Sequence, residues 1–426
     1  MNMKLSKPLS VLMLSGLVLT AACGGGEEEA QVASDPSKLK GKEITVGTWK
    51  GTDAEVKAFD ELLKNFTDET GVKVKKKVYN DYQTQLQTDL VGGTAPDVFY
   101  VDAFLAPELS KQGVLEPLDP YIKKAKKNLN DFYDPAINAF KSDDKLFGLP
   151  KDYSTLGLYY NKKLIEDAGF TADDIPTEME KLPGFLKELK GKLPSGVTPA
   201  ITTSELARHM FVLQSGGTDI VDKEGNAVLA KPDQIAALQP LVDAYQDKLV
   251  QRPADLGQGW AGDSFGAEKA AIMIEGNWAI SHIKQNFPKV EMGTKEVPTI
   301  GGKNKSMMFT VSYSLNSESK EKSAGWAFID YATSKDGMKT WSEGAGVLPS
   351  LKSIATDLKL QDDELKAPFV AAGAYATPWQ KGDSLSIVAR EYNNLLPAAL
   401  KGDMTLEEAM KKAEKTANKD IKTQLK

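Results

Sequence analysis

The stretch Leu146-Phe-Gly-Leu-Pro-Lys-Asp-Tyr-Ser-Thr-Leu-Gly-Leu-Tyr-Tyr-Asn-Lys162 decides how the chain is divided. In it, Gly148, Pro150 and the polar residues 151–155 precede an apolar run, Leu156 to Tyr160. The run is typical of a buried strand, and Gly and Pro are typical of a turn. Strand and helix signals fill the chain on both sides. The stretch is therefore either a crossing between two α/β halves, with a cleft and a hinge beside it, or an ordinary turn before a strand.

The length and composition of the chain indicate a soluble protein with two domains. A chain of 426 residues is long for one hydrophobic core. Its residues are 41% hydrophobic and 26% charged, and the formal net charge is −6 at pH 7. No basic face stands out, and clusters such as Lys75-Lys76-Lys77 are expected at solvated edges, so nucleic acid is not an expected partner.

The amino terminus has the pattern of a secretory signal peptide. Lys4 and Lys7 precede an apolar run from Leu9 to Leu19, and small residues then lead to Cys23, the one cysteine of the chain. An apolar run of this length is too short to indicate a membrane span. We therefore expect residues 1–22 to be removed. Their loss takes away two lysines and no acid, which changes the formal charge from −6 to −8.

Residues Thr20-Ala-Ala-Cys23 resemble the lipobox of bacterial lipoproteins, whose cysteine becomes the lipidated first residue of the mature protein. Thr20 stands where most lipoboxes have Leu, and the alternative is an ordinary signal peptide with an unrelated cysteine. Residues 23–40 have too little apolar content to fold and are expected to form a flexible tether. The resemblance implies an extracytoplasmic protein anchored to the cell membrane, on the cell surface or in the periplasm, by acyl chains on Cys23.

The first half of the chain alternates strands and helices. Ile44 to Trp49 is an apolar strand. Gly71 ends the helix that follows it, and a second strand begins at Val72. Strand, helix and strand in this order predict a parallel sheet. The apolar face of the helix is formed, at spacings of three and four, by Val56, Phe59, Leu62, Leu63 and Phe66.

Two strand ends in this half predict where a ligand binds. A helix that opens at residues 80–83 and is closed by Gly92-Gly93 leads into a strand from Pro96 to Val101. In open α/β sheets, ligands bind outside the carboxyl ends of the strands. Residues 49–53 and 102–104 both occupy that edge of the predicted sheet.

The second half carries its own elements. We expect a helix from Pro232 to Lys248 and strands over residues 270–274 and 307–315. The segment 344–350 is a second crossing, and the last helix begins at Thr405, which has capping-box spacing to Glu408. The predicted lobes are residues 41–151 with 308–349 at the amino-terminal side, and residues 152–307 with 350–426 at the carboxyl-terminal side.

Few residues suit catalysis, so we expect no enzyme, no cofactor and no metal site. His209 and His282 are the only imidazoles, and both are expected to be surface or hydrogen-bonded structural residues. The chain has no Gly-rich, Lys-terminated phosphate loop and no Gly-x-Gly-x-x-Gly after the first strand. A carboxylate pair such as Asp102 and Asp152 leaves glycoside hydrolysis open as an alternative.

Aromatic residues recur beside Asp or Asn at the predicted strand ends, and this pairing suits a sugar. The flat C–H face of a pyranose loses water against an aromatic ring, while carboxylates and amides bind its hydroxyls. Core packing is the alternative for each ring, and it is favoured for Trp326 and Trp341, which lie in helical stretches. The candidate ligand-binding residues are Trp49, Asp53, Asp81, Tyr82, Asp102, Asp152, Tyr153, Ser154, Trp260, Asn277, Trp278, Tyr313 and Trp379.

A succession of motifs along the chain resembles one protein family. The motifs are Ala95-Pro-Asp-Val-Phe-Tyr100, Gly113-Val-Leu-Glu-Pro-Leu118, Gly148-Leu-Pro150 with Tyr159-Tyr-Asn-Lys162, Ala270-Ala-Ile-Met273 with Gly276-Asn-Trp278, and Gly346 with Pro349. The family is that of the extracellular solute-binding proteins of family 1, the maltose-binding-like receptors of ABC sugar importers. The resemblance runs from about Ile44 to the carboxyl end, and it departs from the family pattern where Pro176-Thr-Glu-Met179 replaces Pro-x-Thr-Trp.

The resemblance implies an α/β, two-lobed, periplasmic-binding-protein-like fold. Each lobe would be a mostly parallel sheet flanked by helices, and crossing hinge segments would join the lobes. The resemblance also implies that Trp278 stacks on sugar, that Asp102 and residues 152–154 bind hydroxyls, and that Trp379 caps the carboxyl-lobe side. We therefore expect a monomeric, lipid-anchored receptor that binds a mono- or oligosaccharide and delivers it to the permease of an ABC importer.

Two alternatives to a sugar receptor stay open at this point. A receptor for another solute, such as a polyamine, a polyol phosphate or a metal chelate, would need a basic or acidic pocket instead of aromatic walls. A secreted carbohydrate-active enzyme on the same scaffold would convert its ligand to product.

Overall fold

The computed structural model describes residues 36–425, which fall within one compact unit, residues 31–426. The expected signal peptide, Cys23 and most of the expected tether lie outside the described residues. The strands are β1 (Glu43–Trp49), β2 (Lys73–Tyr79), β3 (Val98–Asp102), β4 (Lys141–Ser142), β5 (Lys145–Leu146), β6 (Leu149–Asn161), β7 (Thr198–Ile201), β8 (Val250–Gln251), β9 (Ala270–Gly276), β10 (Met292–Lys295), β11 (Met307–Leu315) and β12 (Thr377–Pro378).

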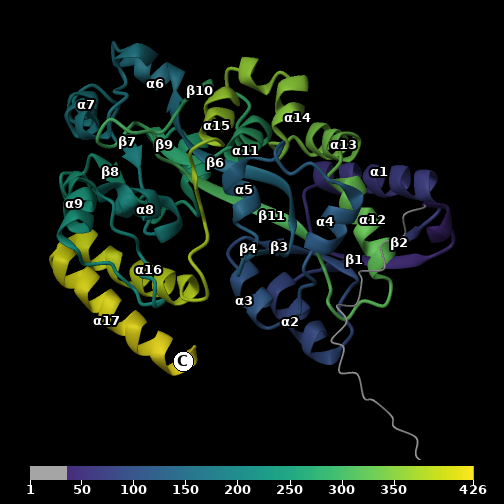
Figure 1. The fold of residues 1–426 in the computed structure, drawn as a ribbon. Coiled ribbons are helices and arrows are strands. Elements are labelled where there is room, and N and C mark those ends of the chain that lie inside the picture. Colours follow the sequence, from purple (N-terminus) through teal and green to yellow (C-terminus); the bar gives the residue numbers. More distant parts are fainter. Residues whose placement is uncertain (1–35, 426) are drawn as a thin grey trace, which may run out of the picture. The chain divides into compact units, whose positions relative to one another are not determined.

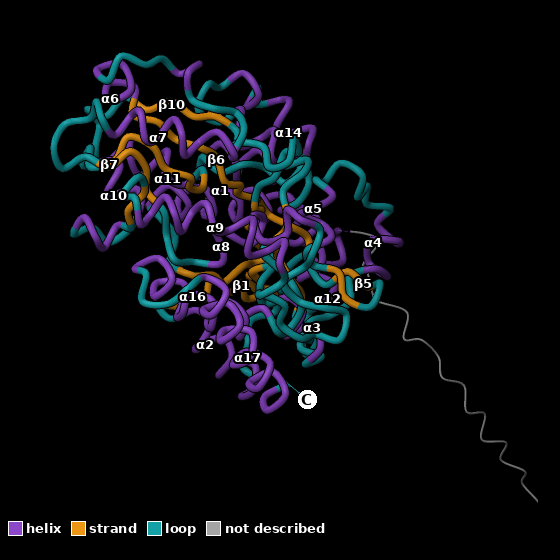
Figure 2. Tube along the Cα trace, turned by 90° about the vertical axis from the view of Figure 1, so that its left-hand side faces the viewer, coloured by secondary structure: helices purple, strands orange, loops and turns teal. Residues whose placement is uncertain are grey.

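The helices flank these strands, as Figure 2 shows. They are α1 (Asp53–Thr70), α2 (Tyr82–Gly92), α3 (Ala106–Lys111), α4 (Asp119–Ala125), α5 (Asp134–Asn138), α6 (Lys162–Asp167), α7 (Leu182–Lys190), α8 (Leu206–Leu213), α9 (Pro232–Gln246), α10 (Ala261–Gly266), α11 (Trp278–Asn286), α12 (Lys322–Ala332), α13 (Lys335–Ala345), α14 (Lys352–Asp357), α15 (Ala367–Ala372), α16 (Leu385–Lys401) and α17 (Leu406–Gln424).

Strand β6 connects the two halves of the sheet (Figure 1). Its first part, residues 149–155, pairs antiparallel with β11. Its second part, residues 156–160, pairs antiparallel with β9 on one side, and β10 pairs with it on the other. The stretch around Asp152 is therefore a crossing strand and not an ordinary turn, whereas its role as a hinge stays a prediction.

The sheet is parallel at its two ends and antiparallel in the middle. The strand order is β2-β1-β3-β11-β6-β9-β7-β8. β1 is parallel to β2 and β3, and β7 is parallel to β8 and β9. β6 carries the chain into the second half and β11 carries it back. The pairs formed by these two crossing strands are antiparallel and lie at the centre of the sheet. Outside them each half is parallel, as predicted.

The carboxyl ends of the parallel strands in the two halves face each other along β6. Asp102 ends β3 and lies level with Asp152 of β6, since both are paired with Val311. Gly276 ends β9 and is paired with Leu156 of β6. Asp152 and Leu156 are four positions apart in the sequence, which corresponds to about 13 Å along a strand. The two edges at which ligands bind in α/β sheets therefore meet over one short segment.

Helix α1 covers the first half of the sheet and follows the predicted periodicity. Its N-cap Thr52 forms a capping box with Glu55, and Gly71 ends the helix at a φ of 71°. The predicted face is buried from Phe59 to Phe66, where Phe59 and Phe66 meet Phe328 of α12. Val56, in the first turn of the helix, is 42% exposed, so the buried part of the predicted face begins at Phe59.

The carboxyl-terminal helices pack on the second half. The predicted capping box of Thr405 and Glu408 opens α17, whose residues Ala409, Met410 and Ala413 are fully buried. α17 packs against α16, and both contact α9 (Figure 1). The predicted helix over residues 232–248 is α9, and the predicted strand over residues 307–315 is β11.

The second predicted crossing segment runs beside the first. The backbone N–H of Tyr153 donates to the Leu348 carbonyl at 3.0 Å, and the Ser350 hydroxyl donates to the Pro150 carbonyl. Residues 348–350 are thus bound to β6 by one backbone hydrogen bond and one serine hydroxyl. Among residues 36–425, no helix combines the length and apolar content that crossing a bilayer requires.

The start of β6 depends on a glycine, which gives a first prediction. A Cβ atom on Gly148 would lie 2.3 Å from the Ser312 hydroxyl oxygen of β11. We expect Gly148→Ala to lower the free energy of unfolding by about 1–3 kcal/mol, because overpacking displaces β11 from β6. Urea unfolding curves measure the change.

The matched control for this substitution is Gly184→Ala. A Cβ on Gly184, in α7, meets nothing within 4 Å. This variant should be as stable as the parent or more stable by about 0.5–1 kcal/mol, since alanine favours the helix. Equal stability of the two variants would show that the close approach at Gly148 does not constrain the crossing strand.

Candidate functional site

Two carboxylates lie on one face of the sheet, on either side of β11. Asp102 and Asp152 are both paired with Val311. Directly paired residues of antiparallel strands point to the same face, and neighbouring strands are about 4.8 Å apart. The backbones of the two aspartates therefore stand about 10 Å apart. They lie where the carboxyl ends of the parallel strands of the two halves meet.

The carboxyl group of Asp102 holds its proton more tightly than an ordinary aspartate. Burial raises its pKa to about 6, and the negative charge of Asp152 adds to the rise. The backbone N–H of Phe104 donates to Asp102 Oδ1 at 2.9 Å, and this hydrogen bond partly offsets the rise in pKa. Near neutral pH the group can accept hydrogen bonds from hydroxyls, and below pH 6 it becomes a donor.

A β-bulge in β6 places Lys151 and Asp152 side by side. Val311 of β11 is paired with Asp152, and the next residue, Ser312, is paired with Pro150. Lys151 therefore has no partner on β11. An extra residue of this kind re-aims the side chains around it, and bulges occur often beside functional sites.

The chain itself holds one oxygen of Asp152. The Lys151 ammonium group forms an ion pair with Asp152 Oδ2. The indole Nε1–H of Trp341, on α13, donates to the same oxygen at 2.9 Å. Because both donors bind Oδ2, the second oxygen of Asp152 can accept a hydrogen bond from a ligand hydroxyl.

Three aromatic rings line the first half of the site. The ring of Trp49, at the end of β1, meets Tyr82 and Tyr100 edge-on, with centroids 5.3 Å and 4.9 Å apart. The Tyr82 hydroxyl donates to the Tyr100 carbonyl at 2.6 Å. These contacts fix the rings beside Lys151 and Asp152.

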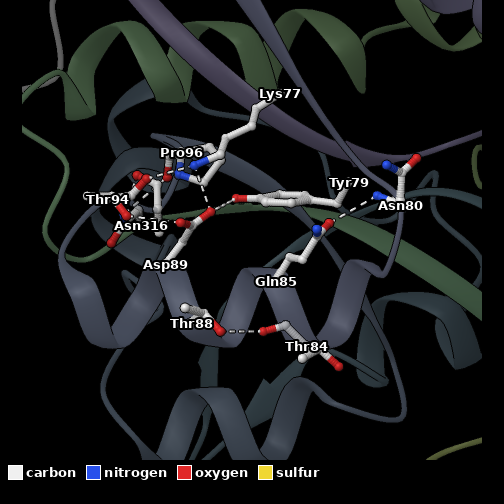
Figure 3. Close-up of polar contacts among 11 residues, drawn as sticks. Lys77, Tyr79, Asn80, Thr84, Gln85, Thr88, Asp89, Thr94, Pro96 and Asn316 are labelled. Carbon is white, nitrogen blue, oxygen red and sulfur yellow. Dashed lines mark hydrogen bonds and ion pairs between the residues drawn. The ribbon is translucent and has the colours of Figure 1, made fainter.

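A polar cluster joins β2 to α2, the helix that begins at Tyr82 (Figure 3). Asp89 on α2 accepts from the Tyr79 hydroxyl at 2.5 Å and forms an ion pair with Lys77 at 2.6 Å. The Thr94 hydroxyl also donates to Asp89 at 3.0 Å. Hydrogen bonds from Lys77 and Tyr79 hold the pKa of Asp89 below its usual value. Because Tyr82 opens α2, this attachment of α2 to β2 positions its ring.

The second half contributes the ring of Trp278, at the start of α11. This ring meets Phe309 of β11 edge-on, with centroids 5.5 Å apart. The guanidinium carbon of Arg208 lies 5.2 Å from the Trp278 ring and 5.4 Å from Phe309. Arg208 is oriented by Glu275, which is 2% exposed and accepts its Nε–H at 2.9 Å.

Phe309 connects Trp278 to the carboxylates. It lies two residues before Val311 on β11, so the two side chains share a face of the sheet. Phe309 is also paired with Ser154 of β6. Trp278 therefore approaches the face that carries Asp102 and Asp152.

A second aromatic pair joins distant parts of the chain. The rings of Phe104 and Trp379 are parallel, with centroids 5.9 Å apart and an angle of 3° between their planes. The Trp379 backbone N–H donates to the Met308 carbonyl at 2.8 Å, which ties it to β11. The structure thus brings together these candidate residues of the sequence analysis: Trp49, Tyr82, Asp102, Asp152, Ser154, Trp278 and Trp379.

Other candidate residues take structural positions. Asp53 is exposed as the first residue of α1, and Asp81 is the N-cap of α2. Tyr153 and Tyr313 are each 1% exposed, and the ring of Tyr153 packs against Tyr133.

Asn277 and Trp260 also contact other residues of the protein itself. Asn277 Oδ1 accepts the Thr155 backbone N–H at 3.1 Å, which attaches α11 to β6. The Trp260 ring lies against His282, with centroids 4.7 Å apart.

Sequence reasoning missed five members of this site: Tyr100, Lys151, Arg208, Phe309 and Trp341. Trp341 was expected to pack in the core, and it is 2% exposed, yet its N–H binds Asp152. Arg208 carried a usable signal, because residues 202–208 follow the carboxyl end of β7. Lys151 and Phe309 depend on a bulge and a strand register that only the paired strands reveal.

The two histidines take the structural positions expected for them. His209 is buried between the hydroxyls of Tyr392 and Thr202, and burial lowers its pKa to about 3. His282 lies 3.0 Å from Asp263. Within the part of the chain that the structure describes, no group of three or more His, Cys, Asp or Glu side chains is arranged to hold a metal ion.

A separate apolar groove of about 370 Å³ lies in the second half. Its walls come from α7, α8 and α9, and its floor from β7 and β9. Of the residues of the site, Arg208 also lines the groove.

Comparison with known proteins identifies what this arrangement resembles. Residues 61–368 match the family model of the bacterial extracellular solute-binding proteins. The galactooligosaccharide-binding protein of Bacillus subtilis is 25% identical over 433 residues, which cover 99% of each chain. The multiple sugar-binding protein of Streptococcus mutans is 26% identical over 381 residues, which cover 83% of this chain and 85% of that protein.

Solved structures share the fold. The sugar-binding protein MalE of Xanthomonas citri superposes with a TM-score of 0.80 at 18% identity, over 89% of this chain and 98% of that one. An ABC substrate-binding protein of Listeria monocytogenes, in complex with cycloalternan, gives a TM-score of 0.76 at 24% identity, over 89% and 99%. The chain therefore has the two-lobed α/β fold of the maltose-binding type.

The electrostatics of Asp102 give a second prediction. Its folded-state pKa of about 6 exceeds the value of about 4 in an unfolded chain. The native state therefore binds more protons between pH 4 and 6, so ionisation of Asp102 lowers stability as the pH rises through this window. The free energy of unfolding of Asp102→Asn, relative to that of the parent, should increase by up to about 3 kcal/mol between pH 4 and pH 7.

Urea unfolding of both proteins at pH 4, 5, 6 and 7 measures this difference. The stability difference should grow up to about pH 6 and then level off. A difference that is constant over the whole range would contradict the burial of this carboxylate.

Proposed function

Since the chain belongs to the bacterial extracellular solute-binding proteins, we propose that it is an extracytoplasmic receptor that binds a mono- or oligosaccharide and delivers it to an ABC importer. The two carboxylates and the aromatic rings at the crossing strand carry this proposal. Asp102 and Asp152 offer acceptors for sugar hydroxyls, and Trp278 and Trp379 offer ring faces. A sugar ring can use both, because its C–H face packs on an aromatic ring while its hydroxyls bind carboxylates.

The names of the relatives support the same class of ligand. The curated relatives described above are a galactooligosaccharide-binding and a multiple sugar-binding protein, and the neighbour from Listeria was solved with cycloalternan. We propose that closure of the two lobes, residues 41–151 with 308–349 and residues 152–307 with 350–426, follows contact of one ligand with both.

We expect moderate affinity from two ring faces and about six hydrogen bonds. Two ring faces of roughly 100 Å² each, at about 25 cal/mol/Å², give about 5 kcal/mol. About six hydrogen bonds at about 1 kcal/mol add a similar amount, and ordering costs of several kcal/mol offset part of the sum. About 8 kcal/mol remains, which corresponds to a dissociation constant near the micromolar range.

The proposal also includes the partners and the place of the protein. We propose a monomer, held at the outer side of the cell membrane by a lipid on Cys23, that presents its loaded form to a membrane permease. The receptor releases its ligand unchanged, so sugar recovered after long incubation should have its original linkages and chain length.

A thermal-shift screen tests the class of ligand. The screen includes mono- and oligosaccharides, polyamines and polyol phosphates, each at millimolar concentration. At about 100 times the dissociation constant a ligand adds about 2.7 kcal/mol, so a bound sugar raises the melting temperature by several degrees. A shift with polyamines or phosphates and none with any sugar would overturn the proposal.

Trp278 provides a third prediction. Trp278→Ala removes a ring face at the meeting of the two halves, and we expect sugar affinity to fall by 2 kcal/mol or more, on the order of an interface hot spot. Isothermal titration calorimetry with the best sugar of the screen measures the loss.

The matched control is Phe170→Ala. Phe170 is a partly buried ring of the same half that packs on Phe185 and lies under Lys192, away from the site. This variant should lose stability and keep its sugar affinity. Equal affinity of the Trp278 variant and the parent would remove Trp278 from the site.

A further inference from the structure

The ammonium group of Lys151 lies inside a box of aromatic rings. Its Nζ atom is 4.3 Å from the ring centroid of Trp341, 4.9 Å from that of Tyr100 and 5.9 Å from that of Trp49. The Lys151 residue is 3% exposed. All three distances are within the range in which a ring attracts a cation.

The rings of the box come from three separate elements and are fixed independently of Lys151. Trp49 ends β1 and packs edge-on against Tyr100 of β3. Trp341, on α13, packs against Phe59 of α1, with centroids 6.4 Å apart. The box is therefore part of the packed first half and does not depend on the lysine for its shape.

One carboxylate completes the box. Asp152 Oδ2 receives both the Lys151 ammonium group and the Trp341 N–H. The other acidic group that faces Asp152 is Asp102 of β3. An aromatic box with a carboxylate at its side is the arrangement with which proteins recognise organic ammonium ions.

The bulge in β6 explains how the chain fills its own box. In a regular strand, Lys151 and Asp152 would point to opposite faces of the sheet. Because Lys151 is the extra residue of the bulge, its side chain reaches the carboxylate of the residue that follows it.

We infer that Lys151 is a specificity-determining residue that acts as an internal cation. Its ammonium group fills the aromatic box and neutralises Asp152, so that this half of the site refuses organic cations and admits neutral hydroxylated ligands. The identity of the neutral ligand rests on the proposed function, whereas the filled box does not.

Lys151→Ala should create a binding site for a small organic ammonium ion. The substitution removes three methylene groups and the ammonium group, which together have the size and charge of n-propylammonium. It leaves the box empty and Asp152, whose side chain is 13% exposed, without its counter-charge. n-Propylammonium should therefore bind this variant, fill the empty box and supply the positive charge that the substitution removes.

The fourth prediction is this chemical rescue, measured on the full chain without sugar. n-Propylammonium chloride should raise the melting temperature of Lys151→Ala in a saturable way, by at least half of the loss that the substitution causes. Calorimetry should give a dissociation constant at least tenfold lower than for the parent. n-Propanol and sodium chloride at the same concentrations should give no such rise.

The control variant is Lys127→Ala. Lys127 is another lysine with little exposure, its side chain 9% exposed and paired with Asp330 at 2.7 Å, and no aromatic box surrounds it among the cation–ring contacts of the described residues. It should lose stability without rescue by n-propylammonium. An equal response of the two variants, or none in Lys151→Ala, would overturn the inference.

If Lys151→Ala does not fold alone, the same comparison is made on refolding yield. Dilution from urea into n-propylammonium should then recover folded protein, and dilution into n-propanol should not; equal yields would again overturn the inference. Because neither readout uses sugar, a failure here leaves the sugar screen of the parent protein unaffected, and the reverse also holds.

Discussion

Strand β6 pairs with two different partners, and this pairing holds the two halves of the sheet together. The first part of the strand is hydrogen-bonded to β11 and the second to β9. This single strand therefore fixes the carboxyl end of β3 and the carboxyl end of β9 about 13 Å apart along its length. Side chains that are more than 100 positions apart in the sequence, such as Asp152 and Trp278, approach one another because of it.

Charge in the site follows from the same strand. Lys151 and Asp152 are neighbours on β6, and the bulge between Pro150 and Asp152 turns them toward each other. Asp102 stands across β11 and carries the raised pKa, because burial and the negative charge of Asp152 both favour its protonated form. One carboxylate is thus paired with a cation, whereas burial raises the pKa of the other. The two acids, which look alike in the sequence, have different chemical roles because their neighbours differ.

Much of the fold could be predicted from the sequence, because it is encoded locally. The periodicity of α1, the capping box at Thr405 and the apolar run of β11 each depend on a few adjacent residues. Trp49 and Asp102 could also be predicted as site residues, because ligands bind outside the carboxyl ends of strands in open α/β sheets. The sequence could not show that Asp152 faces the site while Tyr153 is buried, because the face to which each side chain points depends on the register of β6 against β11. It likewise could not show that Trp341, in a helix expected to pack in the core, binds a carboxylate of the site, because that contact joins residues 189 positions apart.

A crystal structure of the protein with the sugar that binds it most tightly would show where the ligand lies. We expect a sugar ring against Trp278, with hydroxyls within about 3 Å of Asp152 Oδ1 or of the Asp102 carboxylate. One ligand would then touch residues of both halves. A sugar bound only in the groove between α7 and α9, or to one half alone, would contradict a site organised by the crossing strand.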